Sequence, residues 1–140
     1  MNDPHLPALP HAGPARLLSA VVTHADDGVV CEGRIPDDGP HVRAGRCPAF
    51  VLIEVAAQAA AALSALEHGE AGEPPPQGYL VRATGIRLAG GDLEGGTTVR
   101  VLVRRTASAA PLFLFDVQVQ SAGGAELMDG RIGIYVPLRP

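Results

Sequence analysis

One long apolar stretch divides the chain into two parts. Residues 47–63 are apolar at every position except Glu54 and Gln58. The second residue of this stretch is Pro48, and proline fits a first helical turn because its missing N–H would have no partner there. The pattern predicts a helix from Pro48 to about Glu67, roughly 30 Å long. Because its apolar residues lie on every side and no basic cluster flanks it, we expect a core helix that is covered all round rather than a membrane span.

Alternating apolar and polar residues on both sides of this helix predict β-strands. Glycine and proline separate them, above all in a loop at 36–47 and a linker at 69–77. We expect a bulge or bend in the last strand near Asp129 and Gly130. The predicted strands cover residues 16–24, 29–35, 79–88, 97–106, 112–120 and 125–136.

This order of elements, with a single helix between groups of antiparallel strands, is typical of an α+β fold. We predict that residues 1–140 form a single domain in which an antiparallel sheet wraps around one long central helix, with a proline-rich N-terminal segment at 1–14. One curved sheet leaves part of such a helix uncovered, and an open sheet has two edges. Both features predict a dimer.

Composition and charge exclude several other classes of protein. Of the 140 residues, 46% are hydrophobic, and the formal net charge is -4. The eleven basic residues are all arginines and are scattered, so neither nucleic acid nor a membrane is an expected partner. Cys31 and Cys47 form no CxxC pair, and the N-terminus has no signal-peptide pattern. We therefore expect reduced thiols and a cytoplasmic location.

Glu54 is the residue that the apolar pattern leaves unexplained. An ionised carboxylate is costly to bury unless it is paired, hydrogen-bonded or used in chemistry. Gln58 follows four residues later, so on a helix it lies over Glu54 on the same face. This pair predicts a buried polar spot that lines a cavity.

Several motifs resemble those of the hotdog-fold 3-hydroxyacyl-(acyl-carrier-protein) dehydratases. The start of the helix is also similar to that of the branch from aryl-polyene and polyketide-type gene clusters, where the helix begins VPAW. The resemblance covers nearly the whole chain and implies the hotdog fold. The motifs are LPHAGP at 9–14, CPAF at 47–50, PAFVLIEVAAQ at 48–58, GYLV at 78–81 and GIYV at 133–136.

The resemblance implies removal of water from a 3-hydroxyacyl thioester of fatty-acid or polyketide-type biosynthesis. Such a reaction needs a base for the C2 proton and an acid for the leaving C3 hydroxyl. Glu54 matches the acid of the family's helix motif. Counted back from Glu54, the family's spacing places its catalytic histidine at Pro40. The nearest histidine is His41, and a loop shorter by one residue would place it correctly. In the family the histidine and the acid meet across the dimer interface.

Further residues take roles from the same resemblance. Gln58 would orient the acid, and the free N–H groups of Ala49 and Phe50 at the helix start would polarise the thioester carbonyl. Arg43 and Arg46 would contact an acyl carrier protein or its phosphopantetheine phosphate. We expect no metal and no resident cofactor, because the substrate would be carried on phosphopantetheine, as a carrier-protein or CoA thioester.

Two alternatives remain open at this stage. A hotdog thioesterase would use Glu54 to activate water and would not need His41. A non-catalytic hotdog subunit would pair with an active paralogue, which suits the weak match around His41. The dimer itself could consist of two copies of this chain or of this chain and a paralogous hotdog subunit.

Overall fold

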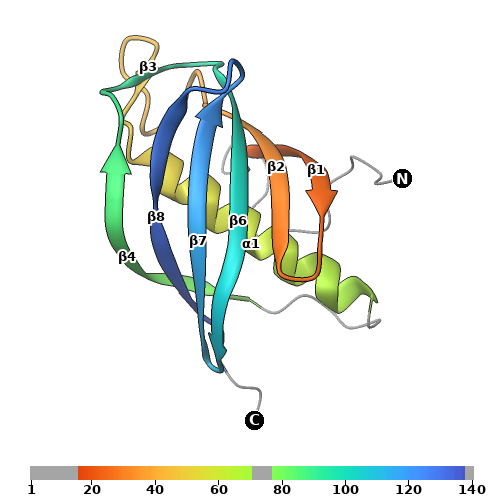
Figure 1. The fold of residues 1–140 in the computed structure, drawn as a ribbon. Helices are drawn as coiled ribbons and strands as arrows, with labels where there is room; N and C mark the ends of the chain where they lie inside the picture. The colour runs from red at the N-terminus through yellow and green to blue at the C-terminus, as the bar shows by residue number, and fades with distance from the viewer. Residues whose placement is uncertain (1–15, 71–76, 138–140) are drawn as a thin grey trace.

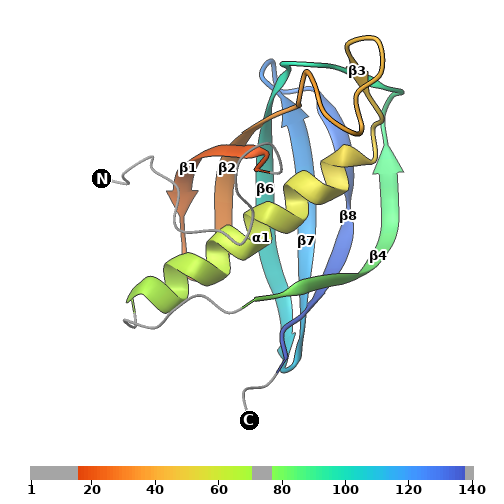
Figure 2. The same ribbon diagram turned by 180° about the vertical axis from the view of Figure 1, so that it is seen from behind.

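An antiparallel sheet wraps around a single long helix in the computed structural model, which describes residues 16–70 and 77–137. Figure 2 shows helix α1 (Val51–Glu70) crossing one face of this sheet, while Figure 1 shows the opposite face. The predicted α+β hotdog architecture is therefore confirmed. In spatial order the strands are β1 (Leu18–His24), β2 (Gly28–Arg34), β6 (Thr98–Ala109), β7 (Leu112–Ser121), β8 (Glu126–Tyr135) and β4 (Tyr79–Leu88).

The predicted strands all occur within the six-stranded sheet, with ends that shift by a few residues. The sequence did not reveal a second, two-stranded sheet of β3 (Arg46–Cys47) and β5 (Leu93–Glu94). Strands of two residues carry no alternation that could be recognised. This small sheet closes the end of the fold at which α1 begins (Figure 2).

Helix α1 begins at Val51, slightly later than the predicted Pro48, and runs to Glu70. The N–H of Val51 donates to the carbonyl of Pro48 at 3.1 Å, which is the tighter bonding of a first helical turn. The helix is long and apolar enough to cross a membrane by composition alone. Here 56% of that window is buried against the protein, as in a core helix.

The core lies between the helix and the inner face of the sheet. Alternation along β6 and β7 turns one set of residues inward, as the sequence predicted. Leu52, Val55 and Leu63 of α1 pack in the same cluster. The inward residues of the two strands that are almost fully buried are Val99, Val101, Val103, Phe115, Val117 and Val119.

The irregularity expected in the last strand, β8, occurs where β8 pairs with β4. Gly130 has a φ of 157°, but the extra residue belongs to β4, where the register shifts between Thr84 and Arg87. A Cβ on Gly130 would lie 2.5 Å from the side chain of Ile86 in that shifted segment. The glycine is thus required by a close approach from β4.

The two edges of the sheet differ in exposure. Strand β1 has seven residues and pairs with β2 through two register irregularities. Strand β4 has ten residues, pairs only with β8, and is exposed at nearly every position. The predicted spare apolar surface is therefore present, and it includes four large exposed side chains of β4, namely Tyr79, Leu80, Val81 and Leu88.

Candidate active site

A groove of about 1100 Å³ runs along one side of α1, between the helix and the ends of the neighbouring strands. Glu54 lies at the N-terminal end of the helix side of this groove. Toward the C-terminus the same side continues with Ala57, Ala61 and Ser64, at helical spacing. These small side chains leave space that larger residues would fill. The opposite wall includes Leu80, Phe113, Phe115, Ile134 and Val136.

Gln58 holds Glu54 from the buried side. Its carbonyl oxygen accepts a hydrogen bond of 2.8 Å from the backbone N–H of Leu17. That bond fixes the amide so that its nitrogen faces Glu54, where it donates to Oε1 over 3.5 Å. Gln58 is completely buried, and it is the only fully buried polar residue among those the structure describes. The predicted polar spot therefore exists, and Leu17 is the partner that the sequence did not reveal.

The helix start presents free amides near this spot. Within the described part of the chain, the N–H groups of Ala49 and Phe50 donate to no carbonyl. Phe50 is 52% exposed, so its surroundings are accessible. Both residues lie about one turn before Glu54, at the positive end of the helix dipole. This arrangement suits an oxygen that gains negative charge.

His41 lies outside the groove. It is exposed on the loop before the helix, and its ring meets Phe50 edge-on with 5.8 Å between the ring centroids. The structure thus brings His41 to the helix start but does not place it among the residues that line the groove with Glu54. The pair that the resemblance implies joins His41 of one subunit to Glu54 of another, and this role of His41 stays a prediction. The LPHAGP motif at 9–14 lies outside the described residues.

Arg43 and Arg46 flank a tight hairpin near the helix start. Their backbones exchange hydrogen bonds of 2.9 and 3.0 Å, and Ala44 and Gly45 between them both have positive φ. The Arg46 guanidinium donates to the carbonyl of Asp92 at 2.7 Å, and both arginines are exposed. They therefore lie on the surface at the same end of the fold as Glu54, and their contact with a carrier protein remains a prediction.

Neither cysteine belongs to the groove. Cys31 and Cys47 are free and completely buried. Burial raises the pKa of the Cys31 thiol to about 12 and also raises the pKa of Cys47, with a smaller contribution from the charge of Asp92. Because the thiolate is the reactive form, both residues are inert packing groups.

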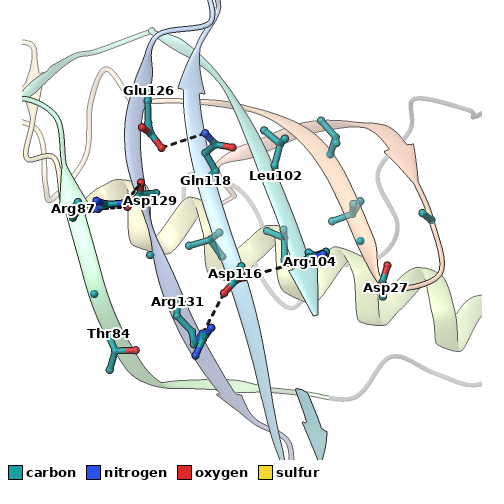
Figure 3. A pocket seen from close by; sticks show the side chains of 18 of the residues that line it. Asp27, Thr84, Arg87, Leu102, Arg104, Asp116, Gln118, Glu126, Asp129 and Arg131 are labelled. Atoms are coloured by element: carbon teal, nitrogen blue, oxygen red, sulfur yellow. Dashed lines mark hydrogen bonds and ion pairs between the residues drawn. The ribbon is translucent and has the colours of Figure 1, made fainter. Parts of the chain in front are cut away.

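A second hollow, of about 880 Å³, lies on the outer face of the sheet (Figure 3). Its side chains pair with one another across the strands. Asp116 accepts from Arg131 at 3.1 Å and lies 3.8 Å from Arg104, while Arg87 makes two bonds of 2.8 Å to Asp129. Exposed pairs of this kind are typical of a solvated sheet face. We therefore place the chemistry in the groove beside α1.

Sequence reasoning missed the charged residues at the far end of the groove. Arg105 of β6 and Glu67 of α1 form an ion pair there, and both line the groove. Arg105 continues the inward series of Val99, Val101 and Val103 in β6. That alternation indicates that the Arg105 side chain points inward. The sequence did not make this obvious, because the adjacent Arg104 is also an arginine and points outward.

A sheet wrapped around one helix, with an acid and an amide one turn apart beside an apolar groove, is the arrangement of the hotdog dehydratase class. Residues 4–140 match the family model of ApeP-like proteins, described as ApeP dehydratase. The chain therefore belongs to the ApeP-like family. This confirms the resemblance to hotdog dehydratases, including their aryl-polyene branch.

Solved structures agree with this assignment. The dehydratase heterocomplex ApeI:P from Xenorhabdus doucetiae is similar with a TM-score of 0.84 and 25% identity, over 94% of this chain and 89% of that one. A hypothetical thioesterase with coenzyme A from Streptococcus pneumoniae has a TM-score of 0.62 and 11% identity, with 84% of each chain covered. Zebra fish thioesterase superfamily member 2 has a TM-score of 0.62 and 16% identity, over 84% of this chain and 80% of that one. The comparison with curated proteins found no match.

These likenesses carry different weight. The family match and the ApeI:P structure support a dehydratase or dehydratase-like protein of polyketide-type biosynthesis. The two thioesterase structures share the fold at low identity, and that likeness shows the fold alone. The thioesterase alternative therefore gains no support from them.

Proposed function

We propose that this chain is one subunit of a hotdog dehydratase that converts a 3-hydroxyacyl thioester into an enoyl thioester and water. The observation that supports this most strongly is the position of Glu54, which lines the groove beside α1 and accepts a hydrogen bond from the buried Gln58. Membership of the ApeP dehydratase family supplies the reaction class. The substrate reaches the groove on the phosphopantetheine of an acyl carrier protein or on CoA.

The chemistry needs two proton transfers. A base removes the C2 proton while the acid group of Glu54 protonates the C3 hydroxyl, so that the C3–O bond breaks, a C2–C3 double bond forms and water leaves. Glu54 then recovers its proton from the base or solvent. The amides of Ala49 and Phe50 stabilise charge on the thioester oxygen during the transfer. Gln58 keeps the acid in one orientation, because its own amide is fixed by Leu17.

The base comes from the second subunit. Tyr79 and Leu80 of β4 line the groove, and β4 is a long edge strand with exposed apolar side chains. An edge of this kind pairs readily with another strand. We propose that a second hotdog subunit adds its own edge strand there and closes the groove with a histidine, while His41 of this chain faces the partner's site. The similar ApeI:P structure is described as a heterocomplex, which favours a paralogous partner over a second copy.

Arg43 and Arg46 suit the entrance for the carrier. Both are exposed on the hairpin at the end of α1 where Glu54 lies. A phosphopantetheine phosphate and an acidic carrier surface are both anionic, and guanidinium groups bind such partners through charge and paired hydrogen bonds. Exchanging both arginines for glutamines should raise the KM for a carrier-bound substrate more than the KM for a pantetheine thioester.

The test combines assembly with turnover. The chain is purified alone and after coexpression with a paralogous hotdog subunit, and native mass spectrometry reports the oligomer. Each preparation then receives a 3-hydroxyacyl-pantetheine thioester, and the enoyl product is followed by absorbance. We expect enoyl formation from the dimer that contains both chains.

Two other results would replace this proposal. Release of free thiol without enoyl product would indicate a thioesterase. Because His41 does not line the groove, a non-catalytic role for this chain is the second candidate. It would be supported if the complex stayed fully active when His41→Ala and Glu54→Gln were introduced together into this chain.

A further inference from the structure

The far end of the groove is charged, although its middle is apolar. Arg105 comes from the inner face of β6, and its terminal nitrogens pair with both carboxylate oxygens of Glu67. The guanidinium also lies 5.8 Å from the centroid of the Phe115 ring, which supports a cation–π contact. The Arg105 side chain is only 20% exposed. This ion pair is therefore partly buried, and both of its residues line the groove.

One donor of this arginine remains unused. The Nε atom of Arg105 is buried and has no hydrogen-bond partner among the residues that the structure describes. A guanidinium group has five N–H donors, and Glu67 takes one from each terminal nitrogen, so a further N–H on each remains available. A buried donor without an acceptor is unfavourable, and structures seldom retain one without a reason. Nε itself is covered by the protein, so an acceptor that enters the groove would bind the remaining terminal N–H groups of Arg105, which lines the groove.

The distance between Glu54 and this end defines what could reach it. Both Glu54 and Glu67 line the groove, and along the helix axis they are separated by about 20 Å. A short acyl chain whose thioester lies at Glu54 would end beside Ala57 or Ala61 and would not reach Arg105. A longer chain would bring its far end against Arg105 and Glu67.

The geometry points to Arg105 as a residue that selects acyl chains by their far end. This inference rests on the proposed function, because it takes the groove as the acyl site. A terminal methyl group would remove water from the ion pair without offering a hydrogen bond, and such desolvation is unfavourable. A hydroxyl or carbonyl at the chain end would instead accept from the remaining terminal N–H groups of Arg105. Long chains with a polar, acceptor-bearing end are therefore preferred over saturated chains of equal length.

The adjacent Arg104 offers a matched control. It lies on the same strand but on the outer face of the sheet, near Asp116 (Figure 3). Its side chain is 68% exposed, compared with 20% for Arg105. Arg104→Met changes the same charge without touching the groove. It should leave every acyl preference as it is.

The experiment uses the complex of this chain with its hotdog partner and measures binding as well as turnover. The probes are two long 3-hydroxyacyl-pantetheine amides of equal length, one ending in a hydroxyl and one in a methyl group. Calorimetry should give the hydroxyl-ended probe the lower Kd, by about tenfold or more, as a hydrogen bond to a charged donor would provide. The double variant Arg105→Met with Glu67→Gln should bring the two Kd values together. The double change avoids leaving a single charge in the groove.

A second variant covers the case in which the double variant does not fold. Arg105→Lys keeps the charge toward Glu67 but lacks the planar set of terminal N–H donors, so it should reduce the preference while thermal unfolding stays near that of the wild type. The inference is overturned if the wild type binds both probes equally. It is also overturned if the variants keep the wild-type preference.

The proposed function is tested separately by a 3-hydroxybutyryl-pantetheine thioester. The acyl chain of this substrate is too short to reach Arg105, and its turnover should be the same in the wild type and in Arg104→Met, which lies outside the groove. Absence of its turnover in the wild-type complex contradicts the proposed function. Its turnover combined with an unchanged Kd ratio contradicts only the role of Arg105.

Discussion

The two sides of helix α1 use similar residues in different environments. The side that faces the sheet, which we call the core side, is completely or almost completely buried and includes Leu52, Val55, Ala59, Ala62 and Leu63. The side that lines the groove, which we call the groove side, is only partly buried and includes Glu54, Ala57, Ala61 and Ser64. Apolar composition alone therefore does not show which side supports the fold and which side binds a ligand.

The size of the side chains explains the difference. On the core side, leucine and valine fill the space against the inward residues of β6 and β7. On the groove side, alanine and serine stop short of the opposite wall, and the remaining space is the groove. Gln58 lies between the two sides, since one end of its amide bonds to Leu17 and the other to Glu54. Changes on the core side should lower stability, and changes on the groove side should lower binding or turnover.

The largest stability effect is expected at Leu63. This side chain is completely buried on the core side, so Leu63→Ala should lower the free energy of unfolding by about 2–5 kcal/mol. Urea denaturation followed by circular dichroism measures the change. Ser64→Ala, on the groove side of the same turn, is the control and should cost far less. Equal losses for the two variants would contradict the division of the helix.

Gln58 should show a smaller effect on stability and an additional effect on turnover. Gln58→Leu fills a similar volume but leaves the N–H of Leu17 without its acceptor, which should cost about 1–3 kcal/mol. Turnover should also fall, because Glu54 loses the hydrogen bond from Gln58. Gln58→Glu provides a comparison, since it keeps an acceptor for Leu17 but places a second carboxyl group beside Glu54. If Gln58→Leu unfolds at the wild-type urea concentration, the bond to Leu17 contributes nothing.

Two neighbouring alanines allow a direct comparison of the sides. Ala62 is completely buried, so Ala62→Leu should overpack the core and cost about 1–3 kcal/mol. Ala61 lines the groove, so Ala61→Leu should change stability by less than about 1 kcal/mol. It should instead weaken the binding of long acyl-pantetheine amides more than that of short ones. The comparison fails if Ala61→Leu is the more destabilising of the two.

The smallest effect is expected at Cys31, whose thiol should not react with a labelling reagent while the protein is folded. Its pKa of about 12 means that roughly one thiol in ten thousand is ionised at pH 8. Raising the pH toward 12 increases the thiolate fraction, but burial still blocks access of the reagent. An aromatic disulfide reagent at pH 8 should therefore label neither cysteine until urea unfolds the protein. Rapid labelling of the native chain would show that the core beneath α1 opens.

Much of the fold could be predicted from the sequence. The apolar stretch at 47–63 and the alternation of the strands reflect local periodicity, which does not depend on distant contacts. The two-residue strands β3 and β5 have no such periodicity. The extra residue opposite Gly130 lies in β4. The sequence could not show which strand would carry it, because the two strands meet only after the chain has folded. The sequence marked the place of this irregularity but not the strand that carries it.

The candidate site could be predicted only in part. Glu54 and Gln58 were identified because polar residues contrast with an apolar helix. Leu17 could not be identified as the partner of Gln58, because a backbone N–H has no signature in the sequence. Arg105 was hidden among the charged residues of its own strand. The position of His41 relative to Glu54 depends on a second subunit, so its role still requires the complex.

The turnover of Glu54→Gln in the assembled complex tests the central claim most directly. This change removes the ionisable proton on the groove side and keeps nearly the same shape. We predict that enoyl formation from a 3-hydroxyacyl-pantetheine thioester falls by about 10²–10⁴-fold, as expected for a lost general acid. Thermal unfolding and probe binding should remain near the wild-type values. Turnover close to that of the wild-type complex, with the variant folded and bound to its partner, would contradict the account.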